Sequence, residues 1–405
     1  LERVLTGGMD NPVDVAFRSD GEPLLSATFL QRPAAGRRDG VVHAVYGGVY
    51  GKQHGVLDDH PRTGELLPVL AHLGPAAACG LHVHSGYGLG AEFRDDAFVC
   101  QFNLRSVIRL RLERSGATFA ARAEPFLAVD AVDFHPTDVI EDADGSLLVV
   151  DTGGWYKLCC PTSQLEKPAV LGGIYRVRRE DTAPTPDPRG LAISWEALGV
   201  AELASLLADD RPAVVARAIE RLEDAGPAAI APAAALLGGE PGSTAAARLA
   251  AARLLTRLET PASQAALRRA LNDPAVEVRQ AAAHAAGLHR DAEAVDGLVT
   301  MAVGDEPGPA RVAAEALGRI AGQRAVSGLL QACRRDADRM LEHALIYGLI
   351  EAGTPELLRE SLKSDMTRVR RRALIAADQL PLQQRRPASR ADALLRGPLI
   401  AACRD

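Results

Sequence analysis

Two stretches of the first half share one pattern and decide its fold. Residues 11–28 read NPVDVAFRSDGEPLLSAT, and residues 135–151 read HPTDVIEDADGSLLVVD, so the two align without a gap at an offset of 124 positions. Each consists of a short apolar run, an Asp-Gly dipeptide and a second apolar run. Asp-Gly favours a tight hairpin because type I′ turns need positive φ at both central residues. The sequence therefore predicts two equivalent β-hairpins.

Further strand-like runs lie between and after these hairpins. They are Cys79–Val83, Phe98–Phe102, Val107–Leu112 and Gly172–Val177. Three units spaced about 60 residues apart are typical of four-stranded blades repeated around an axis. Because propellers usually have about four to eight blades, we expect residues 1–180 to form a partial β-propeller of about three blades rather than a sandwich.

The second half follows a helical period. Its clearest unit is Asp273-Pro274-Ala275-Val276-Glu277-Val278-Arg279, followed by a small-residue run that ends at Gly287, and related starts recur about every 31 residues. Asp before Pro is expected to cap a helix start, and alanine lets neighbouring helices approach closely. This pattern resembles HEAT repeats, and it predicts an α-solenoid of five to six helix pairs that form an open arc or superhelix.

The predicted organisation is therefore a multidomain chain, β first and then α. The boundaries are 1–180 for the partial propeller, 181–194 for a linker marked by Pro184, Pro186 and Pro188, 195–380 for the solenoid, and 381–405 for a tail or incomplete last repeat. Of the 16 aromatic residues, 14 precede residue 195, as expected if alanine packs the second half. Since the chain starts without Met or a leader, we expect it to be a piece of a longer polypeptide.

Charge and cysteine usage narrow the function classes. The net charge of −6 argues against a nucleic-acid binder, and the chain has no apolar run of about 18 residues to span a membrane. Six cysteines in 405 residues are too few for a disulfide scaffold. Because helical solenoids of this type usually serve as protein-interaction surfaces, we expect a protein partner on the solenoid. On the propeller face we expect a sugar or small-molecule ligand.

The candidate catalytic residues are His135 and Asp138, at the start of a predicted innermost strand. Asn11 and Asp14 occupy the same place in the earlier hairpin, and such positions point to the propeller's ligand-binding face or channel. His135 is predicted to act as a general base or as a metal ligand, with its pKa tuned by Asp138. In the alternative interpretation, Asp14 and Asp138 form hydrogen bonds with the backbone between neighbouring blades. Asn11 and Asp14 are ligand-binding candidates only because of their position.

A second candidate region follows the later hairpin. Asp151, Trp155 and Tyr156 are predicted ligand-binding residues, because the aromatic rings would stack on a sugar; packing at a blade junction is the alternative. Adjacent Cys159 and Cys160 could form a disulfide with each other.

The propeller region holds two further cysteines. Cys79 and Cys100 are alternative partners for Cys159 and Cys160, and two disulfides would suit an oxidising compartment, whereas plain buried thiols are the other interpretation. His82 and His84 alternate on one strand, yet no third ligand has diagnostic spacing, so solvated histidines are favoured and no metal site is predicted.

Part of the first half resembles a bacterial family. The residues that carry the resemblance are Met9–Asp14, Arg38–Gly51, Phe134–Val139 and Asp151–Pro161. They look like the propeller of planctomycete-type membrane-bound dehydrogenases, also called haem-binding CxxCH proteins, and more distantly like glucose/sorbosone dehydrogenases. The resemblance implies a periplasmic or other extracytoplasmic setting, with pyrroloquinoline quinone or haem c in the full-length protein. No Cys-x-x-Cys-His occurs in this chain. From the resemblance we also expect the early blades, which hold the catalytic histidine of the quinoprotein relatives, to be absent from it.

Two functional hypotheses follow from these observations. The first is a redox-linked fragment of an extracytoplasmic propeller–HEAT protein, which the resemblance alone supports. The alternative is a non-catalytic glycan- or protein-binding module with a HEAT interaction scaffold.

Overall fold

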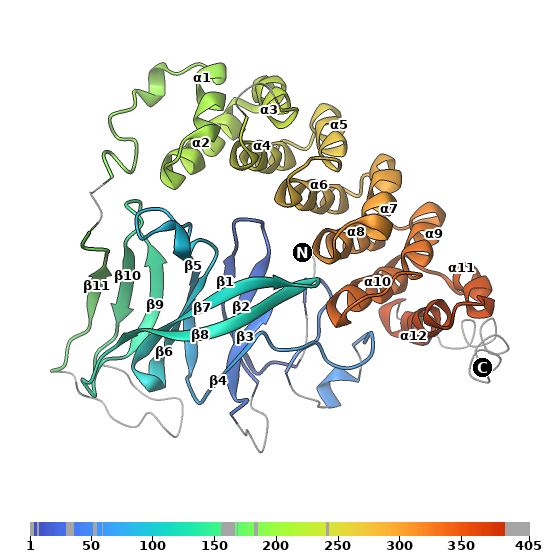
Figure 1. Cartoon of the computed structure of the whole chain (residues 1–405), viewed down its shortest axis with the longest axis horizontal. Coiled ribbons are helices and arrows are strands. Elements are labelled where there is room, and N and C mark those ends of the chain that lie inside the picture. The colour runs from blue at the N-terminus through green and yellow to red at the C-terminus, as the bar shows by residue number, and fades with distance from the viewer. Residues whose placement is uncertain are drawn as a thin grey trace.

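A computed structural model describes residues 4–5, 8–29, 36–51, 55–58, 60–154, 167, 169–181, 185–239 and 243–384. Three antiparallel sheets lie side by side in the first half, and the helices of the second half form an arc that faces them (Figure 1). The predicted order, β first and then α, is confirmed.

The first two sheets have four strands each, and the third has three among the described residues. The first runs in the order β1 (Asn11–Phe17), β2 (Pro23–Thr28), β3 (Asp39–His43) and β4 (Ala71–Gly74). The second runs β5 (Ala78–Val83), β6 (Ala97–Gln101), β7 (Ser106–Ser115) and β8 (Thr118–Ala128), and the third runs β11 (Gly173–Val177), β10 (Leu147–Asp151) and β9 (Pro136–Glu141).

Both predicted hairpins are confirmed. β1 pairs with β2 and β9 with β10, each antiparallel. The turn glycines Gly21 and Gly145 have φ of 87° and 79°, which only glycine adopts at low cost. The Asp-Gly signal therefore located both turns correctly.

The first strands of the three sheets, β1, β5 and β9, are neighbours in space, β5 lying between the other two. Side-chain bonds join neighbouring sheets, among them the bond from the amide of Leu81 on β5 to Asp14 Oδ2 on β1 (2.8 Å). The described sheets do not close a ring, so the propeller arrangement remains a prediction.

The helical half alternates inner and outer helices. The helices nearer the sheets are α2 (Pro212–Ala225), α4 (Ala245–Arg257), α6 (Val276–Leu288), α8 (Pro307–Ile320), α10 (Arg339–Ala352) and α12 (Thr367–Gln384). Their partners are α1 (Val200–Ser205), α3 (Ile230–Leu237), α5 (Pro261–Ala270), α7 (Val295–Gly304), α9 (Gln323–Ala332) and α11 (Pro355–Arg359). The starts of the inner helices follow the predicted spacing of about 31 residues.

The aspartate of the clearest Asp-Pro repeat acts differently from the prediction. α6 begins at Val276 with Ala275 as its N-cap, so Asp273 lies two residues too early to cap it. Asp273 instead accepts hydrogen bonds from the amide of Ala275 (2.8 Å) and from Nε and Nη2 of Arg248 on α4 (2.8 and 3.0 Å). The Asp-Pro pattern thus marks an ion pair between repeats as well as a helix start.

Small residues bring the inner helices into close contact, as the alanine-rich pattern predicted. A Cβ added to Gly318 on α8 would lie 2.7 Å from the Cα of Gly348 on α10, and one added to Gly287 on α6 would lie 2.8 Å from the Cα of Ala316. The largest hydrophobic cluster is built mainly from these helices, and it also includes Phe29 and Tyr50 of the first half. The first sheet and the solenoid therefore share one core, whereas the contacts between neighbouring sheets form two separate clusters.

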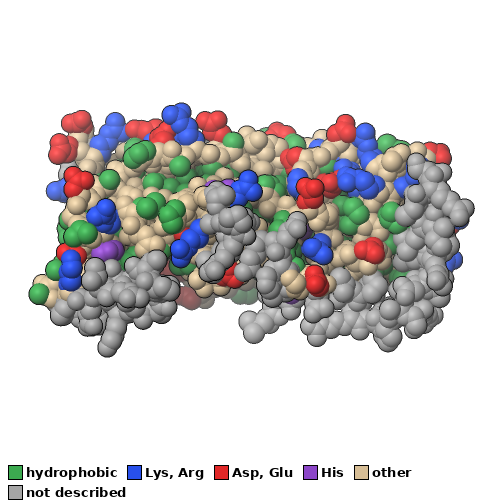
Figure 2. Space-filling view, turned by 90° about the horizontal axis from the view of Figure 1, so that it is seen from below, with side chains coloured by type: hydrophobic (Ala, Val, Ile, Leu, Met, Phe, Trp, Pro, Cys, Tyr) green, Lys and Arg blue, Asp and Glu red, His purple; other side chains and the backbone are tan. Residues whose placement is uncertain are grey.

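The long β7–β8 hairpin reaches across to the helices (Figure 1). At its tip, the amide of Ala117 donates to Asp338 Oδ2 (2.6 Å) at the start of α10, and the carbonyl of Ala117 accepts from Arg311 of α8 (3.1 Å). On the face shown in Figure 2, acidic and basic side chains are interspersed along the molecule. Among the described residues, no helix combines the length and apolarity needed to cross a membrane.

Candidate ligand-binding cavity

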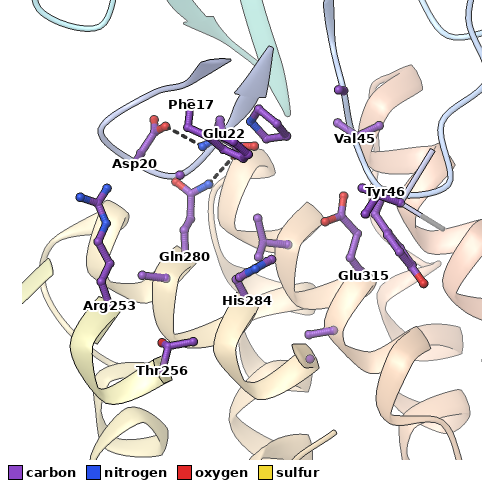
Figure 3. Close-up of a pocket in the computed structure, with 18 of the residues that line it drawn as sticks. Phe17, Asp20, Glu22, Val45, Tyr46, Arg253, Thr256, Gln280, His284 and Glu315 are labelled. Carbon is purple, nitrogen blue, oxygen red and sulfur yellow. Dashed lines mark hydrogen bonds between the residues drawn. The ribbon is translucent and has the colours of Figure 1, made fainter. Parts of the chain in front are cut away.

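A cavity of about 980 Å³ lies between the first sheet and the inner helices. Its sheet side is formed by the β1–β2 hairpin and the segment around Tyr46, and its helical side by α2, α4, α6 and α8 (Figure 3). The volume is at the upper end of the range for small-molecule sites. Apolar lining residues include Val15 and Phe17 of β1, Leu249 of α4 and Val312 of α8.

A buried carboxylate, Glu22, anchors the sheet side of the cavity to the helices. It follows the turn glycine of the first hairpin and accepts bonds from Gln280 Nε2 (2.7 Å), His43 Nε2 (2.9 Å) and the guanidinium of Arg311. Burial opposes its ionisation, but Arg311 and His43 outweigh burial and hold the pKa of Glu22 far below its usual value. Glu22 is therefore charged and fully partnered.

The bonds around His43 assign its tautomer. Nε2 faces the carboxylate of Glu22 and donates to it, so Nδ1 accepts from the hydroxyl of Thr118 (2.9 Å). Burial lowers the pKa of His43 despite the neighbouring carboxylate. His43 is a neutral bridge between the first sheet and β8.

Arg311 is shared between two carboxylates. Its side chain is 2% exposed, and beyond Glu22 it donates to Glu315 Oε1 (2.6 Å), one turn further along α8. Burial raises the pKa of Glu315, and Arg311 offsets this only in part, since Glu22 adds a like charge. The second carboxylate is therefore the weaker partner of the guanidinium.

Two polar side chains of the helical wall extend into the cavity. His284 of α6 and Glu315 of α8 extend from adjacent helices toward the sheet, as Figure 3 shows. Burial lowers the pKa of His284, and Arg319 lowers it further. Within the part of the chain that the structure describes, neither the His284 ring nor Glu315 Oε2 has a hydrogen-bond partner.

The cations of the cavity wall, in contrast, already have partners. Arg257 pairs with Glu223 (2.9 Å), Arg253 donates to the carbonyl of Ser19, and the guanidinium of Arg319 lies 5.0 Å from the centre of the Tyr46 ring. The cavity thus combines apolar walls with an imidazole and a carboxylate oxygen that can bind a ligand.

The predicted catalytic residues lie in the third sheet region, away from the cavity lining. His135 Nδ1 is within bonding distance of the carbonyls of Asp133 (3.0 Å) and Gly153 (2.9 Å), so it donates to main chain, and the ring packs on Phe102. Asp138 Oδ1 accepts the amide of Val139 (2.8 Å). Both side chains thus bond to main-chain groups, and their catalytic role stays a prediction.

The ligand-binding candidates are spread over two sheets. Asn11 is exposed at the start of β1, whereas Asp14 accepts the amides of Val15 and Leu81 (2.8 Å each). Asp151 Oδ1 accepts the amides of His135 and Gly153 (2.8 Å each). Of these bonds, the one from Leu81 to Asp14 runs between two sheets, as the structural alternative expects, and the ligand-binding role of these residues stays a prediction. Trp155 and Tyr156 lie outside the described residues.

The described cysteines are free thiols. Cys79 Sγ donates to the carbonyls of Pro136 (3.3 Å) and Cys100 (3.5 Å), and burial raises its pKa to about 11. Burial also raises the pKa of the Cys100 thiol. Because Cys159 and Cys160 lie outside the described residues, the disulfide prediction concerning them stays a prediction.

His84 differs from the expected solvated histidine. It is fully buried, with Nε2 bonded to the carbonyl of Gly145 (2.9 Å) and the ring packed near Phe98. Its neighbour His82 is half-buried and faces Glu141 (3.4 Å). The alternation on one strand therefore serves contact with the third sheet, and no metal-binding group of three side chains is found in the described ranges.

Sequence reasoning missed the cavity, although two signals pointed to it. Glu22 stands where the equivalent hairpin has Ser146, at the same offset of 124 positions. In the helical half, the 31-residue period places Arg253, His284 and Glu315 at equivalent positions of α4, α6 and α8. Polar residues recurring on an otherwise apolar inner face indicate a shared polar surface.

Comparisons with known proteins identify parts of the chain. A family model of HEAT repeats matches residues 241–318. A second model, described as a domain of unknown function (DUF7133), matches residues 57–181. No curated protein matches the sequence.

Solved structures match distantly. A glucose dehydrogenase-like protein of Thermus thermophilus is 20% identical over 43% of this chain, with a TM-score of 0.30, and the match spans 45% of that protein's length. The CpcE–CpcF phycocyanin lyase of Nostoc is 20% identical over 51% of this chain and 95% of the matched chain (TM-score 0.32). An engineered protein is 20% identical over 45% of this chain and 96% of its own (TM-score 0.29). At these scores the matches carry no functional argument.

Proposed function

We propose that this chain is a binding module whose small-molecule ligand occupies the cavity between the β1–β2 hairpin and the inner helices. The observation that supports this is the cavity itself, about 980 Å³, with walls from both halves of the chain. A large apolar cavity with a few convergent polar groups is the usual form of a ligand site.

The construction of the junction supports the same proposal. The bonds from Arg311 and Gln280 to Glu22 fix the hairpin against α6 and α8. A ligand therefore meets walls that are already in place, which lowers the entropic cost of binding.

The redox function remains a prediction from the resemblance. The chain lacks Cys-x-x-Cys-His, so it does not fit covalently attached haem. Pyrroloquinoline quinone carries three carboxylates, whereas the described acidic groups near His135 are Asp133 and Asp151, with Lys167 paired to Asp133 (2.7 Å). These residues do not fit the quinone, and we derive no redox step. The partial propeller, the extracytoplasmic setting and a protein partner on the HEAT repeats also stay proposals.

The proposal is tested with an uncharged apolar fluorophore, N-phenyl-1-naphthylamine, and the whole chain. The fluorescence of the probe should rise as it binds and should saturate at one equivalent of probe per chain. Ala281→Phe places a ring in the cavity from α6 and should abolish this signal, whereas Ala262→Phe, on an exposed position of α5, should leave it unchanged. Equal signals from both variants, or no saturable binding to the unsubstituted chain, would contradict the proposal.

A further inference from the structure

The two carboxylates beside Arg311 differ in the number of hydrogen bonds that they accept. Glu22 accepts from three side chains, Gln280, His43 and Arg311. Glu315 accepts one bond, on Oε1 (2.6 Å from Arg311 Nη1). Glu315 Oε2 therefore remains available as an acceptor, and the side chain is 13% exposed, toward the cavity.

The charges of this cluster do not balance. Two carboxylates, Glu22 and Glu315, share one guanidinium, and the bridging His43 is neutral. Of the other cations on the wall, Arg253 and Arg257 bond elsewhere. Arg319, which lies over the ring of Tyr46, lowers the pKa of Glu315 less than Arg311 does, and the two together do not offset the effect of burial. A carboxylate with incomplete pairing in an apolar cavity is costly unless a cation reaches it.

The cavity walls around Glu315 are apolar and therefore suit the apolar part of a ligand. Phe17 is 63% exposed although it is a large hydrophobic residue, and Val15 on the same strand is 49% exposed; both line the cavity. Leu249 and Val312 line the helical side. A ring such as Phe17 also attracts a cation placed over its face.

We propose that the cavity binds an organic amine, with the protonated amine at Glu315 Oε2 and the apolar part of the ligand between the β1 side chains Val15 and Phe17 and the inner helices. This inference rests on the proposed function and adds the chemical class of the ligand. The imidazole of His284 extends into the same cavity from the adjacent helix. The burial that raises the pKa of Glu315 is the cost that a bound cation would remove.

Three probes that share a phenylalkyl group and differ in the charge of their polar end separate the effect of the charge from that of the apolar group. They are 4-phenylbutylamine, 4-phenyl-1-butanol and 4-phenylbutyrate, titrated calorimetrically into the whole chain at pH 7. We expect the amine to bind at least about tenfold more tightly than the alcohol, since a charged hydrogen bond contributes about 1.5–3 kcal/mol. The carboxylate should bind most weakly.

The matched variants are Glu315→Gln and Glu306→Gln. In the first, the amide oxygen of the new side chain can still accept from Arg311, so the cluster keeps its shape, and this variant should bind the amine no better than the alcohol. Glu306 is an exposed carboxylate at the start of the same helix, α8, and does not line the cavity, so its neutralisation should change amine binding less than twofold.

The outcomes distinguish the two proposals. Equal affinity of amine and alcohol for the unsubstituted chain would overturn the amine inference and leave the binding function standing, and this comparison does not depend on any variant folding. An unchanged amine affinity in Glu315→Gln would also overturn it. Failure of all three probes and of the neutral fluorophore would overturn the binding function itself.

Discussion

Arg311 on α8 donates a hydrogen bond to Glu22, which lies 289 positions earlier in the chain and follows the first hairpin turn. Both side chains are nearly fully buried, at 2% and 6% exposed. The ion pair therefore ties the sheet half to the solenoid and forms part of the cavity wall.

Replacing Arg311 by Met should destabilise the whole chain. The substitution keeps much of the side-chain volume but leaves Glu22 as a buried charge without its main partner, which costs about 3–5 kcal/mol. Urea unfolding measures the loss. Arg324→Ala, which breaks an exposed pair with Asp296 (63% and 84% exposed), should cost less than about 1 kcal/mol; similar losses in the two variants would argue against the role of Arg311.

Replacing Gly318 by Ala should destabilise the solenoid. The added methyl group would lie 2.7 Å from the Cα of Gly348, so α8 and α10 would have to separate, at about 1–3 kcal/mol. Gly304 ends α7 with open space around it, so Gly304→Ala should be neutral or stabilising by about 0.5–1 kcal/mol. Thermal unfolding of the two variants gives the comparison, and a neutral Gly318→Ala would contradict the close packing.

Buried histidines should make the chain less stable in mild acid. His343 of α10 donates from Nε2 to the carbonyl of Tyr46 (2.8 Å) and accepts at Nδ1 from Thr63 (2.8 Å), and burial lowers its pKa to about 3. Below pH ~6.5 the His343 side chain binds a proton in the unfolded chain but stays neutral in the folded chain. The contribution of His343 to the free energy of unfolding is therefore complete above that pH and is lost as pH falls toward 3.

The measurement is the change in unfolding free energy between pH 7.5 and pH 5. His343→Gln, which can retain both bonds, should lessen this loss by about 2 kcal/mol. His82→Gln, at a half-buried position, controls for removing one histidine. An identical pH dependence in His343→Gln and the unsubstituted chain would refute the assignment.

The coupling energy within each ion pair between repeats should be larger where the pair is more deeply buried. Arg248 and Asp273 join α4 to the start of the next repeat at 13% and 6% exposure, and a double-mutant cycle to alanine should give about 1–3 kcal/mol. Arg257 and Glu223 also join neighbouring repeats but are 53% and 44% exposed, so their coupling should stay below about 1 kcal/mol. Equal coupling energies would show that burial does not set the strength of these pairs.

Local patterns predicted most elements of this fold. Asp20-Gly21 and Asp144-Gly145 located both hairpins, because a positive φ at glycine is a property of a few consecutive residues. The 31-residue period likewise located the inner helices. The role of Asp273 was missed because its partner, Arg248, lies in the preceding repeat.

The cavity could not be predicted in the same way. It exists because the arc of helices is docked on the first sheet, which brings Glu22 beside Gln280 and Arg311. The polar residues that recur every 31 positions mark a polar inner face of the helices, but no local pattern shows that the first sheet docks on that face. The sequence instead directed attention to His135, whose Nδ1 is occupied by main-chain carbonyls.

A crystal structure of the chain with 4-phenylbutylamine bound tests the amine site directly. We expect one ligand in the cavity, its phenyl group against Phe17 and its nitrogen about 3 Å from Glu315 Oε2. A ligand found beside His135, or an empty cavity in crystals soaked above the measured dissociation constant, would refute binding at this site.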